Sequence, residues 1–514
     1  MTVSVSGSDG GKHDWVGLFA VGASNNSDPI LWEYLSGTQN LPPSGLISAT
    51  LTFVLPSNLA PGQYVFNLEF DNGVNAYMLG ASSNTITVTG GGSSATIVAN
   101  LGTTGATIPP DFVGFSDEVP DVIADTIFTP GNTSLINLLK TLGPDGVFRI
   151  GGGSSDSSPP PALTQKIAND TTAFISAVGS GFKIIYGLDA VIENSDIAVT
   201  QAGYILNAFP SANVAFQIGN EPDSFTDEAH WISLFNNYYS ALASRYTGIN
   251  FGGPDTSSLS NISWINGTVL GANGFKYVTG HKYTLPCNCY PTCNPTPPTP
   301  AQVIADATVP ANPGVRITEF GIICDGGQTG VTNVLMAATY YLRLAQSAFS
   351  GGYLGIDPHN VLIPELWGDG LTRPAYYNQF IHEPDGGYAP APMFYGMYLF
   401  ARLEGQASIG TTVDPSLNNL ASVNAARGAH GNANILVVNI STDQQITVVP
   451  KQTQSWSTAD VYLLSGQSCV DPNPVLNGEP VGEGGAWAGS PMSLSNGASI
   501  SIPACGAALI EIQP

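Results

Sequence analysis

Short apolar segments alternate with longer segments of helical periodicity through the middle of the chain, and this alternation restricts the fold more than any other feature. Helical stretches such as 228–245 and 334–348 separate the apolar segments. Strands that alternate with helices build parallel sheets, and eight such units over about 300 residues fit a closed (β/α)8 barrel. We therefore predict a TIM barrel over residues 95–403. Its expected strands are Phe112–Ser116, Gly146–Ile150, Lys183–Leu188, Ala215–Gly219, Asn250–Gly253, Tyr277–His281, Gly314–Glu319 and Tyr353–Ile356.

Strand-rich segments flank the predicted barrel. Residues 1–89 alternate polar and apolar positions in short runs between Pro-Gly and Asn-Gly turns, which predicts an additional N-terminal β-sandwich. The Gly/Ser-rich run 90–94 has the composition of a flexible linker. Residues 404–514 return to alternating strands, so a C-terminal β-sandwich is expected to close the chain.

The N-terminal segment carries a recognisable spacing of motifs. These are His13–Phe19, Trp32–Tyr34, Pro61–Tyr64 and Asp71–Gly73. Over the whole of residues 1–89 this spacing resembles a SKICH-like immunoglobulin-type module. The resemblance implies an immunoglobulin-like fold and an accessory role. Trp15 and Trp32 occupy strand positions and are expected to pack in its core.

The charge balance excludes several classes of partner. The chain has 38 acidic and 14 basic residues, giving a net charge of −24. Such a chain repels nucleic acids and anionic membrane surfaces. It also has no apolar run approaching the ~18 residues that span a bilayer. We expect neither nucleic-acid binding nor membrane insertion.

Cysteines and glycosylation sequons favour a secreted glycoprotein, although the first residues lack a signal-peptide pattern. Cys469 and Cys505 lie in the strand-rich C-terminal segment and are expected to form a disulfide. The cysteines whose pairing stays open are Cys287, Cys289, Cys293 and Cys324. Their spacing does not fit a zinc site, so no metal site or cofactor is predicted. The sequons begin at Asn25, Asn132, Asn169, Asn261, Asn266 and Asn439.

Two glutamates end predicted strands of the barrel. Glu221 follows the fourth strand within Gly-Asn-Glu-Pro, and Glu319 ends the seventh within Ile-Thr-Glu-Phe-Gly. Barrel enzymes carry their chemistry at this end of the strands. Glycoside hydrolysis needs one carboxylic acid to protonate the leaving oxygen and, in retaining enzymes, one carboxylate to attack the anomeric carbon. We predict that Glu221 is the acid/base and Glu319 the nucleophile.

The surrounding motifs resemble those of a known family. Asn220, Glu221 and Glu319 resemble the signatures of clan A glycoside hydrolases. More narrowly, the motifs Ile108–Ser116, Phe148–Asp156 and His281–Tyr283 resemble glycoside hydrolase family 79, the β-glucuronidase and heparanase family. This resemblance covers residues 95–514. It implies a C-terminal sandwich packed on the barrel and completed by a strand at residues 95–100.

The resemblance also implies roles for side chains around the two glutamates. Asn220 would contact the sugar 2-hydroxyl, while Glu118 and Asp156 would accept hydrogen bonds from other hydroxyls. Arg149 is expected to orient the catalytic carboxylates, because a charge inside a barrel must be paired. The His281–Tyr283 motif adds His281 as a supporting residue and Tyr283 as a substrate-binding residue.

Recognition of a uronate carboxylate is only partly encoded. The residues that the resemblance assigns to it are Gly326, Gly327 and Tyr388. The family's tyrosine five residues after the nucleophile is Cys324 here, and Asp325 follows it. Asp325 would repel a substrate carboxylate. Lys282 could offset that repulsion or bind the uronate, or it could simply pair with Asp325.

These features predict a retaining, exo-acting β-glycosidase that removes terminal β-linked glucuronic acid and needs no cofactor. Exo action is expected because long insertions at 286–300 and 362–385 follow strands and overhang the cleft. One alternative is a β-glucosidase or β-xylosidase acting on a neutral sugar. A second, from another class, is a non-catalytic carbohydrate-binding protein.

Overall fold

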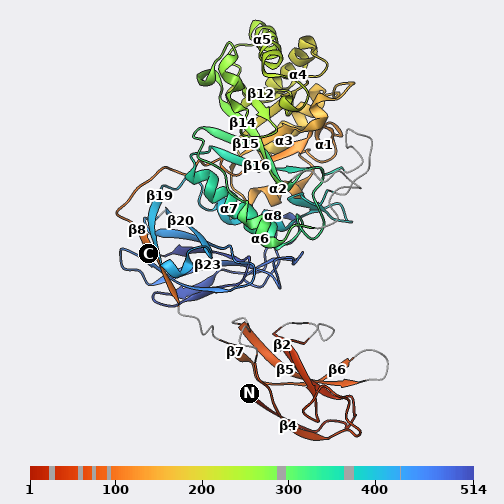
Figure 1. Ribbon diagram of the computed structural model, residues 1–514. Helices are drawn as coiled ribbons and strands as arrows, with labels where there is room; N and C mark the ends of the chain where they lie inside the picture. The colour runs from red at the N-terminus through yellow and green to blue at the C-terminus, as the bar shows by residue number, and fades with distance from the viewer. Residues whose placement is uncertain are drawn as a thin grey trace. The chain divides into compact units, whose positions relative to one another are not determined.

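The computed structural model describes residues 1–21, 23, 29–55, 59, 62–71, 77–88, 94–285, 297–363, 375–428 and 430–513. The chain forms two compact units, Met1–Ser93 and Ser94–Pro514. Each unit has its own hydrophobic core and is described separately (Figure 1).

The first unit is built from β-strands. One pair joins β1 (Thr2–Ser6) to β4 (Ser48–Thr52). The second sheet has the order β3-β2-β5-β6, with β7 on β5. Val16 and Leu18 of β2 pack with Leu51 of β4, so the two sheets share a core. Trp15 is buried and its ring lies 5.8 Å from that of the half-buried Trp32. The strands of the second sheet are β2 (Trp15–Ala20), β3 (Leu31–Tyr34), β5 (Gly62–Asp71), β6 (Tyr77–Ser82) and β7 (Ile86–Val88).

The second unit contains the predicted barrel. Eight strands lie in the order β12-β11-β10-β9-β16-β15-β14-β13, and all adjacent pairs are parallel. A bridge between Phe216 and Phe251 brings the two edges of the sheet together. The prediction of a (β/α)8 barrel with a further β-rich domain is confirmed. The strands are β9 (Phe115–Glu118), β10 (Asp145–Gly151), β11 (Gly181–Leu188), β12 (Val214–Ile218), β13 (Gly252–Thr256), β14 (Tyr277–Leu285), β15 (Val315–Ile323) and β16 (Gly355–Asn360).

Helices cover the outside of the barrel (Figure 1). Thr164, Asn194 and Asp227 each accept a hydrogen bond from a first-turn N–H, which starts α3, α4 and α5 at these residues. Within the described ranges, no helix combines the length and apolarity needed to cross a bilayer. The helices are α1 (Val119–Ile123), α2 (Thr133–Lys140), α3 (Gln165–Val178), α4 (Ser195–Ala208), α5 (Glu228–Arg245), α6 (Pro300–Ala305), α7 (Leu335–Ser350) and α8 (Pro392–Ala401).

Six barrel strands extend further toward their carboxyl ends than predicted, and the fifth and eighth do so through polar residues. The fifth ends at Thr256 rather than Gly253, and the eighth begins at Gly355 and ends at Asn360 rather than Ile356. Their sequences, GGPDT and GIDPHN, contain few strand-forming residues, yet every residue in them is buried. Polar side chains are tolerated inside the barrel because other barrel residues bond to them. Asp357, for example, accepts two hydrogen bonds from Arg316.

The remaining strands form a ten-stranded sheet in the order β24-β23-β27-β21-β20-β19-β8-β22-β26, with β25 on β23. As the resemblance implied, β8 at residues 95–100 joins this sheet, antiparallel to β19 and parallel to β22. The two halves of the sheet share one core, so the domain is a sandwich. Its strands are β8 (Ala95–Asn100), β19 (Ser408–Val413), β20 (Ala421–Arg427), β21 (Ala433–Asn439), β22 (Ile446–Gln452), β23 (Thr458–Ser465), β24 (Val475–Leu476), β25 (Met492–Ser495), β26 (Ile500–Ile502) and β27 (Ala507–Ile512).

The sandwich and the barrel are joined by a continuous core. On β21, Ile435 and Val437 face the sandwich interior, whereas Leu436 and Val438 belong to the barrel core. Helix α7 is buried on nearly all sides, as expected for a helix between two layers. Figure 1 shows α7 and α8 between the barrel strands and the sheet that contains β20 and β23.

The cysteines and sequons can be placed only in part. Cys469 and Cys505 form a disulfide, and Cys324 is also disulfide-bonded. Asn439 has no exposed surface and its amide donates to three backbone carbonyls, so it cannot carry a glycan. Asn266 is exposed. The predicted positions that lie outside the described residues are Asn25, Cys287, Cys289 and Cys293.

Candidate active site

Glu221 and Glu319 meet at the carboxyl end of the barrel. Glu221 lies three residues beyond β12 in the left-handed conformation, with φ 48° and ψ 51°. Its N–H donates to the carbonyl oxygen of Asp255 at 2.9 Å, which fixes this turn. Glu319 lies within β15. One carboxylate oxygen of each glutamate and one ring nitrogen of His281 all lie within 4.8 Å of one another.

Glu319 is buried among positive and hydrogen-donating groups. Arg149 Nη1 donates to Oε2 at 2.6 Å, and the Tyr283 hydroxyl donates to Oε1 at 2.8 Å. Nδ1 atoms of His359 and His281 lie 3.8 and 3.9 Å from Oε2. Burial alone raises the pKa of Glu319, but His359, His281 and Arg149 together lower it to about 2. Glu319 is therefore ionised at neutral pH.

Arg149 links the side chains around Glu319. It lies on β10, is 1% exposed, and donates to five side chains from four other strands and the turn after β12. The shortest bonds are those to Glu319, Asn220 and Asp255, at 2.6, 2.6 and 2.7 Å. Ser116 and Gln217 accept the other two. Arg149 therefore lies where it can orient the Glu319 carboxylate, which is the role expected from the sequence.

His281 lies between Glu221 and Asp255. Its Nδ1 is 2.8 Å from Glu221 Oε1, and its Nε2 is 3.2 Å from Asp255 Oδ1. Burial lowers the pKa of His281, but Asp255 and Glu319 overcome this and raise it to about 10. A doubly protonated imidazole has no lone pair for a metal ion. Although Glu221, His281 and Glu319 cluster closely enough to ligate one, this charge state opposes metal binding.

Two buried residues of the site were not predicted from the sequence. Asp255, on β13, accepts hydrogen bonds from Arg149, Gln217 and Thr318. Although burial raises its pKa, Arg149 and His281 lower it well below the usual range. His359, on β16, bonds to Ser116 and lies 3.2 Å from a Glu118 oxygen. Asp255 and His359 lie a few residues beyond the segments that were predicted as the fifth and eighth strands. A polar residue shortly after a predicted strand was therefore the signal that could have identified them.

The two predicted hydroxyl acceptors are largely occupied by the protein. Glu118 accepts hydrogen bonds from the N–H and hydroxyl of Ser154 and lies next to His359. Asp156 accepts the N–H groups of Ala190 and Asn220, each at 2.6 Å. Burial raises the pKa of Asp156 to about 7 despite these bonds. Asp156 therefore holds the turn that carries Asn220, a function the sequence analysis did not assign to it.

The residues expected to bind a uronate carboxylate make contacts of their own within the structure. His281 and Tyr283 contact the catalytic glutamates, so side-chain alternation along β14 directs Lys282 to the opposite face. The N–H of Gly327 donates to the Cys324 carbonyl, and the Gly326 carbonyl accepts from Tyr376. Tyr388 lines a separate cavity, whose lining includes neither catalytic glutamate.

A different tyrosine lies near the nucleophile. Tyr377 is buried, and its ring lies 5.9 Å from the His359 ring. Its pKa is raised well above the usual value by burial and then by the charges of Glu118, Glu319 and Asp325. These interactions place Tyr377 next to the catalytic side chains.

Comparisons with solved structures agree with this architecture, whereas the comparisons by sequence found no match. No protein-family model matches the chain, and no curated protein matches it. A similar solved structure is a 4-O-α-L-rhamnosyl-β-D-glucuronidase from Fusarium oxysporum 12S, with a TM-score of 0.57 and 17% identity. The match covers 79% of this chain and 97% of that one.

Two further similar structures act on other sugars. A GH51 α-L-arabinofuranosidase from Thermotoga petrophila RKU-1 has a TM-score of 0.57 and 12% identity. A β-xylosidase from Caulobacter crescentus CB15 has a TM-score of 0.54 and 13% identity. Each match covers 82% of this chain and the whole of the other. At these identities the likeness shows the fold, a (β/α)8 barrel joined to a β-rich domain, and leaves the substrate open.

Proposed function

We propose that the chain is a retaining glycoside hydrolase in which Glu319 is the nucleophile and Glu221 the acid/base. The observation that carries this proposal is the close approach of the two carboxylates, which have oxygens within 4.8 Å of each other, with Glu221 after β12 and Glu319 within β15. Retaining enzymes hold their carboxyl groups ~5–5.5 Å apart, whereas inverting enzymes leave ~6.5–9.5 Å for a water molecule. The close approach of the nearest carboxylate oxygens therefore favours the retaining geometry.

In the first step, an ionised Glu319 oxygen attacks the anomeric carbon and forms a glycosyl ester as the glycosidic C–O bond breaks. Glu221 gives its proton to the departing oxygen. His281 forms a hydrogen bond with Oε1 of Glu221, so we place the proton that Glu221 donates on its other oxygen, Oε2. In the second step, Glu221 takes a proton from water, and the resulting hydroxyl oxygen displaces Glu319 from the sugar. The electron pair of the ester bond returns to Glu319.

The neighbouring residues have defined tasks in this mechanism. Tyr283 and Arg149 hold one oxygen each of Glu319, so the nucleophile keeps a single orientation. Arg149 also binds Oδ1 of Asn220, which leaves the Asn220 amide nitrogen as the donor for a sugar hydroxyl. Arg149, His281 and Asp255 act as positioning residues.

Substitution of each glutamate tests the mechanism. We expect Glu319→Gln to lower kcat/KM for an aryl glycoside by at least ~10³-fold. Azide should restore turnover to a Glu221→Gly variant on a substrate with a good leaving group, because a small anion can replace the missing base. Glu228→Gln, exposed on α5, serves as the matched control. NMR should show the β-anomer as the first product; an α-anomer would overturn the retaining assignment.

The sugar is a separate part of the proposal, and the described residues favour a neutral one. Alternation along β14 directs Lys282 away from Glu319, Tyr388 lines another cavity, and the charges of Glu118 and Asp325 act on Tyr377. A uronate carboxylate would meet repulsion from these groups. We propose a β-glucoside or β-xyloside as the substrate. The alternative is a β-glucuronide, which the sequence resemblance and the Fusarium enzyme favour.

Nitrophenyl glycosides distinguish these substrates directly. We expect the glucoside or xyloside to be hydrolysed with kcat/KM at least tenfold above that of the glucuronide. The reverse order would restore the glucuronide prediction while leaving the catalytic residues unchanged. If none of the three nitrophenyl glycosides is hydrolysed, the proposed substrate is wrong. The role of Glu319 can then still be tested on other glycosides.

An extracellular location is also part of the proposal. The Cys469–Cys505 disulfide supports it, because such bonds form and persist in oxidising compartments. Mass spectrometry of protein isolated from the native source, after thiol alkylation, should show both cysteines unlabelled. Labelling of both would contradict this location.

A further inference from the structure

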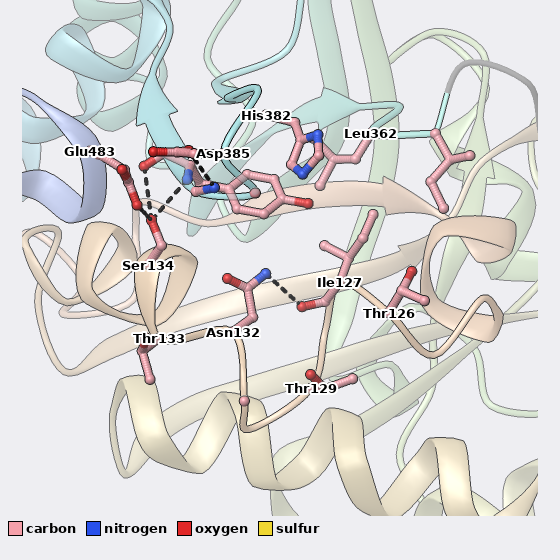
Figure 2. A pocket seen from close by; sticks show the side chains of 15 residues that line it. Thr126, Ile127, Thr129, Asn132, Thr133, Ser134, Leu362, His382, Asp385 and Glu483 are labelled. Atoms are coloured by element: carbon pink, nitrogen blue, oxygen red, sulfur yellow. Dashed lines mark hydrogen bonds between the residues drawn. The ribbon is translucent and has the colours of Figure 1, made fainter.

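A cavity of about 600 Å³ opens on the barrel outside the cluster of catalytic side chains (Figure 2). Four parts of the chain line it: the segment between α1 and α2, residues 362–363 after β16, the β17–β18 hairpin, and Glu483 in the C-terminal domain. The hairpin consists of β17 (Phe380–His382) and β18 (Tyr388–Pro390). This volume lies within the range of small-molecule binding sites.

Hydrogen bonds join the start of α2, the β17–β18 hairpin and Glu483 on one side of the cavity. The Ser134 hydroxyl accepts the N–H of Tyr388 at 2.8 Å and lies 3.0 Å from a Glu483 oxygen. Asn132 donates to the Ile127 carbonyl and caps α2 by accepting from Leu135. These bonds hold the lining in place before any ligand arrives, which lowers the entropy cost of binding.

Asp121 fixes the opposite side of the cavity. Its two carboxylate oxygens accept the N–H groups of Leu362 and Ile363, at 2.6 and 2.9 Å. These residues directly follow β16, and Asp121 lies on α1, directly after β9. The cavity therefore lies at the carboxyl ends of the first and eighth strands, on the rim that also carries the catalytic glutamates.

The lining has the chemical groups that recognise sugars. Hydroxyls of Thr126 and Thr129 can both donate and accept hydrogen bonds, which matches the character of sugar hydroxyls. The rings of His382 and Tyr388 lie 5.1 Å apart and form an aromatic corner against which a C–H face can pack. A combination of apolar rings and fixed polar groups is typical of ligand sites.

Charge restricts the ligand further. Asp385 and Glu483 are the carboxyl side chains of the lining, and its described residues include neither lysine nor arginine. Anions would be repelled, so phosphates and uronates do not fit. A neutral, polyhydroxylated ligand meets all of these conditions.

We propose that this cavity is a second carbohydrate-binding site, which takes a neutral sugar unit from the part of an oligosaccharide that does not enter the catalytic centre. This inference rests on the proposed glycosidase function for the choice of an oligosaccharide as ligand. It also assigns a different role to Tyr388, which contributes to the second site rather than to the catalytic one.

Isothermal titration of the full chain tests this site without requiring turnover. Glu319→Gln protein would be titrated with β-glucan and β-xylan oligosaccharides of two to six units and with their uronate-bearing counterparts. Thr129→Trp adds bulk to the cavity, and His382→Ala removes one ring from an exposed position. The matched control is Ser176→Trp, which adds the same bulk on the exposed side of α3.

We expect at least one neutral oligosaccharide to bind through both the catalytic centre and this cavity. Thr129→Trp and His382→Ala should each weaken its binding at least tenfold, and Ser176→Trp should leave it unchanged. Binding that neither cavity variant alters would overturn the inference, as would equal binding of uronate-bearing chains in the cavity. The proposed function fails separately, if wild-type protein hydrolyses none of these ligands while the cavity still binds them.

Discussion

Arg149 offers the sharpest test of how this site is stabilised. An Arg149→Met substitution keeps much of the side-chain volume but removes a fully buried cation. Asp255, with no exposed surface, then loses its bond at 2.7 Å, and Glu319 loses its bond at 2.6 Å. Breaking a buried ion pair by removing one partner costs about 3–5 kcal/mol, because the remaining charge stays buried. We expect a loss of that size in the free energy of unfolding.

Guanidinium chloride unfolding, followed by circular dichroism, measures this loss. A second substitution separates the charge effect from a packing effect. Asp255→Asn in the Arg149→Met background removes the buried charge that has lost its arginine partner, so it should recover about 1–3 kcal/mol of the loss. The control is Arg245→Met, the same replacement at an exposed position on α5, which should change stability by no more than about 0.5 kcal/mol.

Two results would refute the reasoning about Arg149. If Arg149→Met is destabilised by less than 1 kcal/mol, roughly the value of one neutral hydrogen bond, the buried charge is not compensated as described. If Asp255→Asn adds to the loss instead of recovering it, packing rather than charge explains the effect.

Three further predictions follow from Glu319 and from the C-terminal disulfide. The pKa of Glu319 is lowered to about 2 from 4.5, so its stabilising contribution of about 3 kcal/mol is present above pH 4.5 and lost as the pH falls through 2. The stability difference between wild type and Glu319→Gln should therefore narrow between pH 7 and pH 2.5; a constant difference contradicts the assignment. Tyr283→Phe removes the donor to Glu319 Oε1 and should lower kcat by roughly 10²-fold with little change in KM, and an unchanged kcat would exclude this role. Replacing Cys469 and Cys505 with alanine opens a loop with a sequence separation of 36 and should lower the free energy of unfolding by about 3–4 kcal/mol; an unchanged denaturation midpoint would show that the bond adds no stability.

The alternation of strands and helices was sufficient to predict the barrel, because both periodicities follow from burial of one face of each element. The same reasoning predicted where Glu221 and Glu319 lie, since each follows or ends an apolar strand such as Val214–Ile218. The prediction was weakest where a strand ends in polar residues. Asp255 and His359 lie in such ends, and their burial depends on partners from distant strands that no local pattern reveals.

The substrate residues show a different limit. Lys282 was assigned from its motif, although alternation along a strand that already carries His281 and Tyr283 would have directed it away from the site. Tyr388 was assigned by its place in a loop; it lines a cavity, and Tyr377, which was not assigned, lies next to the catalytic side chains. Loop paths depend on tertiary contacts, such as the bond from the Tyr376 N–H to the Gly326 carbonyl, that spacing along the chain does not encode.

The position of β8 has a consequence for biosynthesis. Residues 95–100 leave the ribosome before any of the barrel, yet their neighbours in the sheet are residues 408–413 and 446–452. During translation this strand has exposed edges and an apolar face, and both stay uncovered until nearly the whole chain has been made. Contacts so distant in sequence also slow folding. The newly made chain is therefore expected to need protection by chaperones, and a truncation before residue 446 should aggregate rather than yield a free barrel.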